Sequence, residues 1–536
     1  MSSINIVGAG LAGLSAAIAL AEKGVGCTLI SLQQSERAQS VLAEGGINAA
    51  LDTMGENDRI SEHFEDTLKG GAFLADPNAV MGLTNGAPEI LRWLIGLGVP
   101  FNMKGGEVVL RNFGGQKKKR TAYARSSTGK IIMSAVIDEA RKYEAKGLIK
   151  RFAHHELVSL IANSGSCTGV KIKDTYTDKT ACLYGQVILC TGGMNGVFPK
   201  MTTGTTQNSG AAAAAAFCQG VVFSNLEMLQ YHPTTIGISN KRCLVTEAAR
   251  GEGGRLFIEK NGKPWYFMEE KYPELKNLMP RDVVAREMYF VRRQNDTGDS
   301  VYLDMTGLDD DTWKTKLSDL RAEIISYLAI DPGSEPVPVR EGIHYFMGGI
   351  DVDELHRTNL KGLYAAGECT SQYHGANRLG GNSMLGALYG GRKAAQTALS
   401  ERDGAYDDKE PVFSADDDKR LQEASPVFIE KLSEILLGAM GIVRSERGIK
   451  KALSALDELS AERGYNRREL DRLALAKAML LSALERRESR GAHYREDCPE
   501  TREELRKITA AAYADGSVNI SFRAIPERRG SFEDKA

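Results

Sequence analysis

The first thirty residues restrict the fold more than any other part of the chain. The apolar run Ile4-Asn-Ile-Val7 leads into Gly8-Ala9-Gly10-Leu11-Ala12-Gly13, and helical spacing follows as far as Gly24. This order predicts a strand, a tight turn and a helix. The first glycine permits the turn, the second lets an anion approach the backbone, and the third lets helix and strand pack closely. We therefore predict a Rossmann-like α/β domain that binds a dinucleotide through this motif, including Ala9 and Ala12.

The acidic residue that commonly binds the cofactor ribose is missing from this unit. The second predicted strand, Cys27-Thr-Leu-Ile30, is followed by Ser31. A serine hydroxyl still donates and accepts hydrogen bonds, so Ser31 is the predicted ribose contact, although a weaker one than a carboxylate.

Length and composition place the chain among ordinary folded proteins. Its 536 residues are too many for one hydrophobic core, so we expect two or three domains. The formal net charge of −2 gives no electrostatic basis for binding nucleic acid. The short basic run Lys117-Lys-Lys-Arg120 is interpreted as a solvated loop.

The eight cysteines are scattered, with no CxxC pair and no four-cysteine cluster. A sequence-encoded iron–sulfur, haem c or dithiol site is therefore not expected, and we predict no metal site. No stretch approaches the roughly 20 apolar residues of a membrane span, and no signal sequence is evident. We expect a cytoplasmic protein without direct membrane insertion.

Further glycine-containing segments are predicted to lie against a flat ligand, because glycine lets the backbone approach closely. They are Ala43-Glu44-Gly45-Gly46, for which an ordinary turn is the alternative, and Cys190-Thr191-Gly192-Gly193, which ends a buried strand. An arginine, Arg378, stands directly before a glycine-rich helix start. Such a junction can bind a carboxylate on one side and a cofactor on the other. The alternative is a surface turn whose arginine caps a helix or pairs with an acid.

Other polar residues have both an ordinary and a functional interpretation. Thr246, Glu247 and Arg250 lie within one helical turn, and a surface pair of the last two would contribute only roughly 0.3 kcal/mol. Arg281, after a proline, would ordinarily be a surface charge. His232, before Pro233, would ordinarily be a structural histidine, and we interpret His493 in the same way.

These segments occur in the order found in one family. The chain resembles the flavoprotein subunits of fumarate reductase and succinate dehydrogenase, with L-aspartate oxidase as a close relative, from residue 4 to about residue 500. The motifs that carry the resemblance are Gly8 to Gly13, Ala43 to Gly46, His232-Pro-Thr234, Thr246 to Gly254, Pro280-Arg-Asp282, His344 to Gly349, Gly367-Glu368 and His374 to Ser383.

The resemblance implies FAD as the cofactor and an α/β fold with three parts. A Rossmann-like FAD-binding domain would comprise residues 1–225 and 340–405, and an inserted α+β capping domain, residues 226–339, would close over the flavin. Helical spacing at 429–437 and 473–487 predicts a C-terminal helical domain at 406–536. The charged segment that starts at Asp403 is interpreted as a linker.

The resemblance also implies roles for single residues. Arg281 would protonate the substrate, and Glu247 and Arg250 would reprotonate Arg281. The substrate carboxylates would be bound by His344, Arg378 and Thr246, with His232 nearby. Besides the first glycine motif and Ser31, the predicted FAD contacts are Ser40, Ala43, Glu44, Gly45, Gly46, Thr191, Gly192, Glu368, Arg378, Asn382, Ser383 and Leu385.

Two positions distinguish members of the family. The histidine that carries covalent flavin in respiratory members is replaced by Gln39, which lacks a nucleophilic ring nitrogen, so the resemblance implies non-covalent FAD, a lower flavin potential and the reductive direction. Aspartate oxidases have a glutamate that recognises the substrate amino group where this chain has Phe113. This argues against aspartate as substrate.

We therefore predict a flavoenzyme that reduces fumarate to succinate by hydride transfer from flavin N5, with Arg281 as proton donor. The alternatives are an L-aspartate oxidase, a reductase of another unsaturated carboxylate, and a flavin-carrying subunit without its own turnover. The expected partners are a small dicarboxylate substrate and a protein or small-molecule electron donor. The sequence does not identify that donor.

Overall fold

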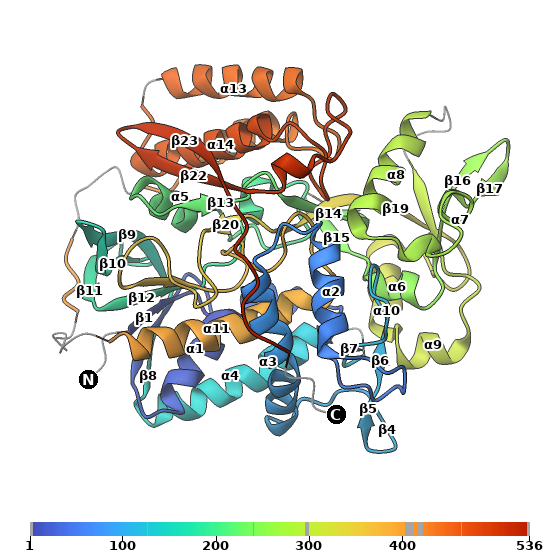
Figure 1. Ribbon diagram of the computed structural model, residues 1–536, viewed down its shortest axis with the longest axis horizontal. Helices are drawn as coiled ribbons and strands as arrows, with labels where there is room; N and C mark the ends of the chain where they lie inside the picture. The colour runs from blue at the N-terminus through green and yellow to red at the C-terminus, as the bar shows by residue number, and fades with distance from the viewer. Residues whose placement is uncertain are drawn as a thin grey trace.

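The computed structural model describes residues 4–125, 127–239, 241–294, 300–402, 411–415, 422–462 and 464–532. Residues 403–410, most of the predicted linker, lie outside this set. In Figure 1 the elements of residues 247–328 gather at the right, the C-terminal helices lie across the top, and the helices around the N-terminal unit lie at the bottom.

A five-stranded parallel sheet organises the N-terminal part of the fold, in the order β21-β12-β1-β2-β8. β1 and β12 are buried at every position, as expected for a parallel sheet covered on both faces. The predicted strand, turn and helix at the N-terminus are confirmed. The strands are β1 (Ile4–Val7), β2 (Cys27–Ser31), β8 (Ile149–Ala153), β12 (Gln186–Leu189) and β21 (Leu363–Ala365).

Helices cover this sheet, and two of them approach each other very closely. α1 packs on α11, where a Cβ at Gly391 would lie only 2.1 Å from the Ala12 carbonyl oxygen, so a glycine is required there. The helices of this part are α1 (Leu11–Ala21), α2 (Ile60–Gly70), α3 (Pro77–Gly96), α4 (Thr128–Ala145) and α11 (Asn382–Ser400).

Smaller sheets complete the N-terminal part. β9 (His155–Asn163), β10 (Ser166–Asp174) and β11 (Thr180–Tyr184) form an antiparallel sheet whose apolar residues share a core with β12 and with α5 (Ala211–Cys218). The remaining short strands are β3 (Ile47–Asn48), β6 (Leu110–Arg111) and β7 (Thr121–Ala122), which form one sheet, and the pair β4 (Met103–Lys104) and β5 (Glu107–Val108).

The basic run at 117–120 is only partly a solvated loop. Lys117 and Lys119 have exposed side chains, but Arg120 is completely buried. Its guanidinium lies 2.8 Å from the Asp58 carboxylate and 3.1 Å from that of Asp66. The solvated interpretation is therefore wrong for Arg120, because two acids distant in sequence provide a buried partner for its charge.

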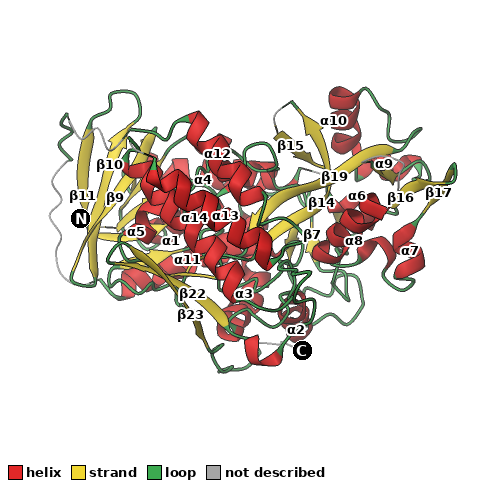
Figure 2. Ribbon diagram, turned by 90° about the horizontal axis from the view of Figure 1, so that it is seen from above, coloured by secondary structure: helices red, strands yellow, loops and turns green. Residues whose placement is uncertain are grey.

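The inserted part contains a six-stranded antiparallel sheet in the order β15-β14-β19-β18-β16-β17. Figure 2 shows this sheet and its helices together at one end of the molecule. We refer to this sheet and its helices as the cap. Its strands are β14 (Leu229–Ile238), β15 (Lys241–Leu244), β16 (Arg255–Lys260), β17 (Lys263–Trp265), β18 (Val301–Asp304) and β19 (Val337–Phe346). Its helices are α6 (Glu247–Gly251), α7 (Phe267–Lys271), α8 (Arg281–Gln294), α9 (Asp310–Thr315) and α10 (Ser318–Leu328). The division at 226–339 remains a proposal.

The C-terminal part contains helices and also a β-hairpin. The two predicted helical segments lie in α12 (Pro426–Leu437) and α14 (Arg467–Glu485), and a further helix, α13 (Glu446–Ala461), lies between them in the chain. After them, β22 (Ile508–Ala514) and β23 (Ser517–Arg523) form a hairpin that pairs with β13 (Phe223–Ser224), which in turn pairs with β20 (Gly349–Ile350). A purely helical description of this part was incomplete.

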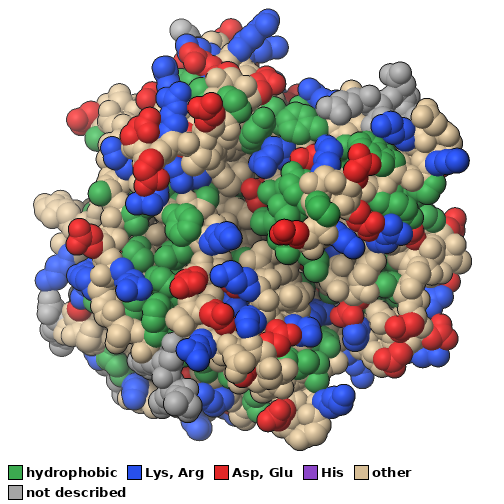
Figure 3. All heavy atoms as spheres, turned by 45° about the vertical axis from the view of Figure 1, so that its right-hand side comes forward, with side chains coloured by type: hydrophobic (Ala, Val, Ile, Leu, Met, Phe, Trp, Pro, Cys, Tyr) green, Lys and Arg blue, Asp and Glu red, His purple; other side chains and the backbone are tan. Residues whose placement is uncertain are grey.

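The surface charge, the length of the helices and the grouping of metal-binding side chains bear on the expectations from the sequence. On the face in Figure 3, basic and acidic side chains are intermingled, in agreement with the small net charge. Among the described residues, no helix is long and apolar enough to cross a membrane. The same residues contain no cluster of three or more side chains suited to hold a metal ion.

Candidate active site

A deep cavity lies where the carboxyl ends of β1, β2 and β12 meet α11 and the cap. Its lining includes residues 7–12, 30–34 and 190–193 from the three strand ends. At the opposite end it is lined by residues of β14 and β19 and by the first residue of α8. Parallel α/β sheets bind ligands at the carboxyl ends of their strands, so this cavity is the candidate site.

The turn after β1 has the geometry that a diphosphate requires. Gly8 has a φ of +115°, and a Cβ there would lie 2.0 Å from the Cys190 carbonyl oxygen. A Cβ at Gly13 would lie 1.8 Å from the Gly8 oxygen. Gly10 is the N-cap of α1 and offers no side chain that would block an anion. The positive end of this helix therefore borders the cavity, and these residues fit the pyrophosphate of FAD.

Most of the predicted FAD contacts line the cavity, and three do not. Gly13 packs against the Gly8 turn, Leu385 is completely buried in the core, and the Asn382 side chain bonds to Thr67 on α2. The predicted contacts in the lining are Gly8, Ala9, Gly10, Ala12, Ser31, Ser40, Ala43, Glu44, Gly45, Gly46, Thr191, Gly192, Glu368, Arg378 and Ser383.

Local hydrogen bonds explain how some of these residues are held. Ser40 Oγ accepts a hydrogen bond from the Leu11 amide at 3.2 Å, at the start of α1. The Ser31 hydroxyl donates to the Gln33 carbonyl at 2.7 Å, which leaves its oxygen free to accept. Burial raises the pKa of Glu368 to about 7, and this carboxyl accepts from the Phe346 amide at 3.2 Å.

Gln39 lies in the cavity wall, where it serves as a hydrogen-bond acceptor. Its Oε1 accepts from the Thr205 amide, which links the segment after β2 to the loop before α5. The amide side chain has no nucleophilic ring nitrogen.

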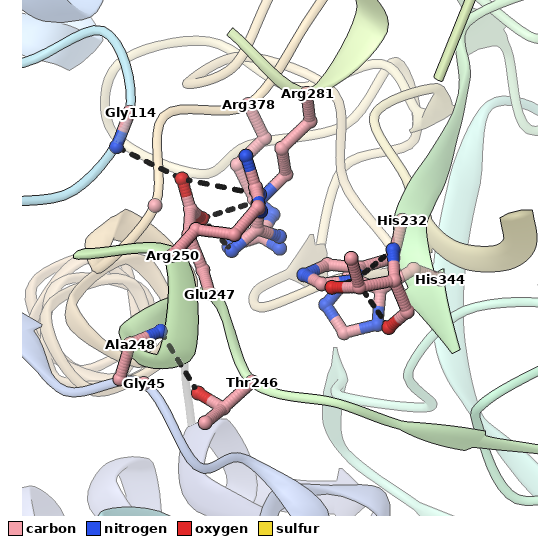
Figure 4. Close-up of polar contacts among 12 residues, drawn as sticks. Gly45, Gly114, His232, Thr246, Glu247, Ala248, Arg250, Arg281, His344 and Arg378 are labelled. Carbon is pink, nitrogen blue, oxygen red and sulfur yellow. Dashed lines mark hydrogen bonds and ion pairs between the residues drawn. The ribbon is translucent and has the colours of Figure 1, made fainter. Parts of the chain in front are cut away.

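The opposite end of the cavity brings together polar residues from five segments (Figure 4). His232 lies on β14, His344 on β19 and Arg281 at the start of α8. Thr246 is the N-cap of α6 and accepts from the Ala248 amide at 3.4 Å. His232, Thr246, Glu247, Arg281, His344 and Arg378 all line the cavity, whereas Arg250 is buried behind them.

Glu247 is the centre of a buried ionic group. Arg281 Nε donates to Glu247 Oε2 at 2.7 Å, and Arg281 Nη2 lies 2.6 Å from the same oxygen. The other oxygen accepts from the Gly114 amide at 2.8 Å and lies 3.8 Å from Arg250 Nη2. Burial alone would raise the pKa of Glu247, but the two arginines outweigh it and hold that pKa below its usual value. The carboxylate is therefore ionised.

His232 and His344 form a neutral pair across the cavity from this group. Their ring centroids are 5.1 Å apart. His232 Nδ1 lies 3.0 Å from the Thr234 carbonyl oxygen, and His344 Nδ1 lies 2.8 Å from the Thr203 hydroxyl. Burial, reinforced by the charge of Arg281, lowers the pKa of both rings well below the usual histidine value. Both rings can therefore form hydrogen bonds to a ligand without carrying charge.

Arg378 is buried and has a free hydrogen-bond donor. Its guanidinium lies 4.4 Å from the centroid of the Tyr345 ring, and its Nε has no partner among the described residues. Burial, and then the charge of Arg281, lower the pKa of Arg378 to about 9. Arg281 and Arg378 line this end of the cavity, and Arg250 lies behind them against Glu247, so the arginines outnumber the ionised carboxylate of Glu247 and this end suits an anionic ligand.

Sequence reasoning missed several residues of the site. Tyr345 lies inside the motif His344 to Gly349, and Gln230 lies two residues before the motif that starts at His232. Gln230 Oε1 accepts from Arg281 Nη1 at 3.3 Å. No motif in the sequence marks Thr203, which contacts His344 in the folded chain. No motif marks residues 155–157 of β9 either, which line the cavity far from the polar end.

Comparison with known proteins agrees with this geometry. Residues 4–384 match the model of an FAD binding domain, and residues 468–529 match that of the fumarate reductase flavoprotein C-terminus. The chain is 36% identical to the succinate dehydrogenase flavoprotein subunit of Bacillus subtilis, over 96% of this chain and 94% of that protein. The chain belongs to this flavoprotein family.

Other members of the succinate dehydrogenase and fumarate reductase family show its breadth. L-aspartate oxidase of Pyrococcus furiosus is 32% identical, over 94% of this chain and 97% of that protein. A solved quinol-fumarate reductase with bound menaquinol superposes with a TM-score of 0.86 at 28% identity, over 99% of both chains. The protein is thus a flavoenzyme of this family, and the predicted resemblance and FAD cofactor are confirmed.

Proposed function

We propose that the protein reduces fumarate, or a closely similar short unsaturated dicarboxylate, to its saturated product. The observation that carries the proposal is Arg281, which is buried, lines the cavity and is held by the ionised Glu247 opposite Arg378. A guanidinium in this position can both attract a carboxylate and deliver a proton.

At the end of the cavity that contains Glu247 and Arg281, some side chains bind the substrate and others transfer the proton. Arg378, His344 and Thr246 bind the two carboxylates, with His232 beside them. Positive charge fixed in a dry cavity stabilises the negative charge that develops on a carboxylate during reduction. Arg281 donates a proton to one alkene carbon, and Glu247 with Arg250 behind it returns a proton to Arg281.

FAD, when bound and reduced, supplies a hydride from N5 to the other alkene carbon. The glycine turn after β1, Ser40, residues 43–46, Thr191, Gly192, Glu368 and Ser383 hold it in the cavity. Gln39 leaves the flavin unattached, and the reductive direction is favoured. The cap, which supplies His232, Arg281 and His344, closes over the substrate and excludes water.

The electrons come from a partner. Relatives are described as subunits, such as the 8-methylmenaquinol:fumarate reductase flavoprotein subunit of Wolinella succinogenes. We propose an electron-donor protein or a small reductant, in a cytoplasmic location.

Anaerobic reoxidation of the reduced protein tests the function. FAD-loaded protein is reduced with dithionite, and fumarate is added while the flavin absorbance is recorded. Rapid return of the oxidised spectrum is expected. In a separate aerobic assay of the oxidised protein, turnover of aspartate with reduction of oxygen to hydrogen peroxide would instead identify an aspartate oxidase. In the anaerobic assay, preference for a monocarboxylate enoate would identify another reductase. No reoxidation by fumarate or by the enoate, together with no turnover of aspartate, would indicate a subunit without turnover.

The Arg281→Gln substitution tests the proton donor. Fumarate reduction should fall by roughly 1000-fold, the size expected for loss of a general acid, while FAD remains bound. Arg255→Gln is the matched control, since Arg255 lies on the same cap but pairs with Glu269 at 2.7 Å with 43% of its side chain exposed. Near-normal turnover of Arg281→Gln would refute the assignment.

A further inference from the structure

A completely buried polar network lies behind the glycine-rich start of α11. It joins four separate segments of the chain. Of its members, only Asn382 was predicted from the sequence, as an FAD contact. Its side chains are Asn48, His63, Thr67, Gln116, Thr121 and Asn382, each no more than 6% exposed.

Two amide side chains converge on one carbonyl oxygen. Asn48 Nδ2 donates to the Gly380 oxygen at 2.8 Å, and Gln116 Nε2 donates to the same oxygen at 2.9 Å. The two amides are also joined to each other, since Gln116 Nε2 donates to Asn48 Oδ1 at 3.0 Å. The Thr121 hydroxyl donates to that oxygen at 2.6 Å. Asn48 and Gln116 therefore fix the direction of the Gly380 carbonyl.

The network is anchored to α2 and to the first turn of α11. Asn382 Oδ1 accepts from Asn48 Nδ2 at 2.7 Å and contacts His63 Nε2 at 3.0 Å, and Asn382 Nδ2 donates to Thr67 at 2.9 Å. Burial lowers the pKa of His63 to about 3, so the ring is neutral. Because Asn382 Oδ1 can only accept, the contact at 3.0 Å assigns the ring proton to Nε2. Both side-chain amide hydrogens of Asn48 and both of Gln116 then have acceptors. Exchanging the oxygen and nitrogen of either amide would break these hydrogen bonds.

This arrangement determines where the next backbone amide points. In a trans peptide the N–H projects opposite to the carbonyl, so fixing the Gly380 oxygen towards Asn48 turns the Gly381 N–H the other way. Gly381 lines the cavity, and its N–H has no acceptor among the residues that the structure describes. Gly381 has a φ of +83°, and a Cβ there would lie 2.0 Å from Asn48 Oδ1, so no other residue fits.

A second buried donor borders the same part of the cavity. Arg378 Nε, three residues earlier, also has no partner in the described chain. Two unused donors at the start of a 19-residue helix make this wall of the cavity suited to negative charge. Two-electron reduction of FAD with uptake of one proton places a negative charge on the flavin ring.

We propose that Asn48 and Gln116 are positioning residues that hold the Gly381 N–H towards the flavin and thereby raise its reduction potential. The inference rests on the proposed placement of the flavin ring in this cavity, but it does not depend on which acid is reduced. Neither side chain lines the cavity, so both act through the peptide that they orient.

The test is the midpoint potential of bound FAD, measured by equilibration with reference dyes in the absence of substrate. Gln116→Leu removes one of the two donors to the Gly380 oxygen. The ratio of reduced to oxidised flavin at a given potential should fall by about tenfold, a shift of about 30 mV to more negative values for a two-electron couple. Gln186→Leu is the control, because Gln186 is an equally buried glutamine at the amino end of β12.

Thr121→Val provides a second variant that keeps the shape of the side chain. It removes the hydroxyl that donates to Asn48 Oδ1 at 2.6 Å and lies 3.3 Å from Gln116 Oε1, but leaves both donors to the Gly380 oxygen in place. A smaller shift in the same direction is expected. A Gln116→Leu or Thr121→Val protein that binds FAD with the wild-type potential would overturn the inference. Failure of the wild-type protein to reduce fumarate would refute the proposed function but would leave this measurement intact.

Discussion

At the scale of single residues, burial has different consequences for the histidines and the arginines in and near the site. Burial lowers the pKa of His232, His344 and His374 so far that these rings are neutral at pH 7. The arginines also lose stabilisation, but the pKa of Arg378 at about 9 and that of Arg250 at about 10 leave both protonated. Recognition of an anion therefore depends on arginine charge, and the histidines contribute hydrogen bonds alone.

His493, far from the reacting groups, provides a measurable case of the same effect. Its Nδ1 accepts from Arg444 Nη1 at 2.9 Å, and its Nε2 lies 3.1 Å from the Arg486 carbonyl. Burial and the arginines lower the pKa of His493 well below 6.5, so the ring stays neutral in the folded protein. The unfolded chain binds this proton below about pH 6.5, and the contribution of His493 to stability falls by about 1.4 kcal/mol per pH unit below that value.

We therefore expect His493→Gln to destabilise the protein at pH 7.5 and to do so progressively less as the pH falls from 6.5 to 5.5. Urea unfolding of both proteins across this range measures the difference. A difference in unfolding free energy that is constant with pH would contradict a neutral, buried His493.

Candidate site residues that belong to a contiguous motif could be predicted from the sequence. Residues that come together only in the folded chain could not. Arg281, Glu247 and Arg378 were found because their neighbours form recognisable patterns. Asn48 and Gln116 are 68 positions apart and meet at Gly380 only in the folded chain. Nothing local marks either of them. The partner acids of Arg120 were missed for the same reason.

At the scale of elements, strands and helices with clear periodicity were predicted well, and the C-terminal hairpin was missed. Residues 508–514 are rich in alanine, which favours a helix, whereas their neighbours in space are strands β13 and β23. The informative signal was the dipeptide Asp515-Gly516. Both residues have positive φ, 49° and 77°, as a two-residue hairpin turn of type I′ requires.

The geometry of the hairpin turn predicts how a substitution there changes stability. Gly516→Ala should lower the free energy of unfolding by about 1 kcal/mol, because a Cβ is strained at a φ of +77°. Gly438→Ala is the matched control, since Gly438 has a φ of −63° and ordinary contacts for a Cβ. Denaturant unfolding measures both. Equal effects of the two substitutions would contradict the turn geometry.

At the scale of the whole molecule, the cavity is shared by segments that are distant in the chain. It is lined by residues from Val7 to Glu423, including β1, β9, β14, β19 and the start of α11. A ligand that binds there contacts both the parallel sheet and the cap. Bound FAD should therefore stabilise the entire fold rather than one part of it.

We propose that FAD is bound without a covalent link, because the amide of Gln39 has no nucleophilic ring nitrogen, and this stabilisation should then depend on FAD concentration. Acid precipitation is expected to leave all FAD in the supernatant and a colourless pellet. Free FAD at 100 times its Kd should stabilise the folded protein by about 2.7 kcal/mol, visible as a higher midpoint of unfolding. Flavin that remains in the pellet would show a covalent link and contradict the assignment of Gln39.

The strand order β21-β12-β1-β2-β8 also constrains the order of events during synthesis. β1 emerges from the ribosome first, but its sheet is completed only by β21 at residues 363–365, after the whole cap has been made. Domains often fold as they emerge, so the cap can assemble while the first sheet still lacks its last strand. α11, which forms the wall nearest the flavin, follows still later. A nascent chain shorter than about 400 residues therefore cannot yet enclose its cofactor.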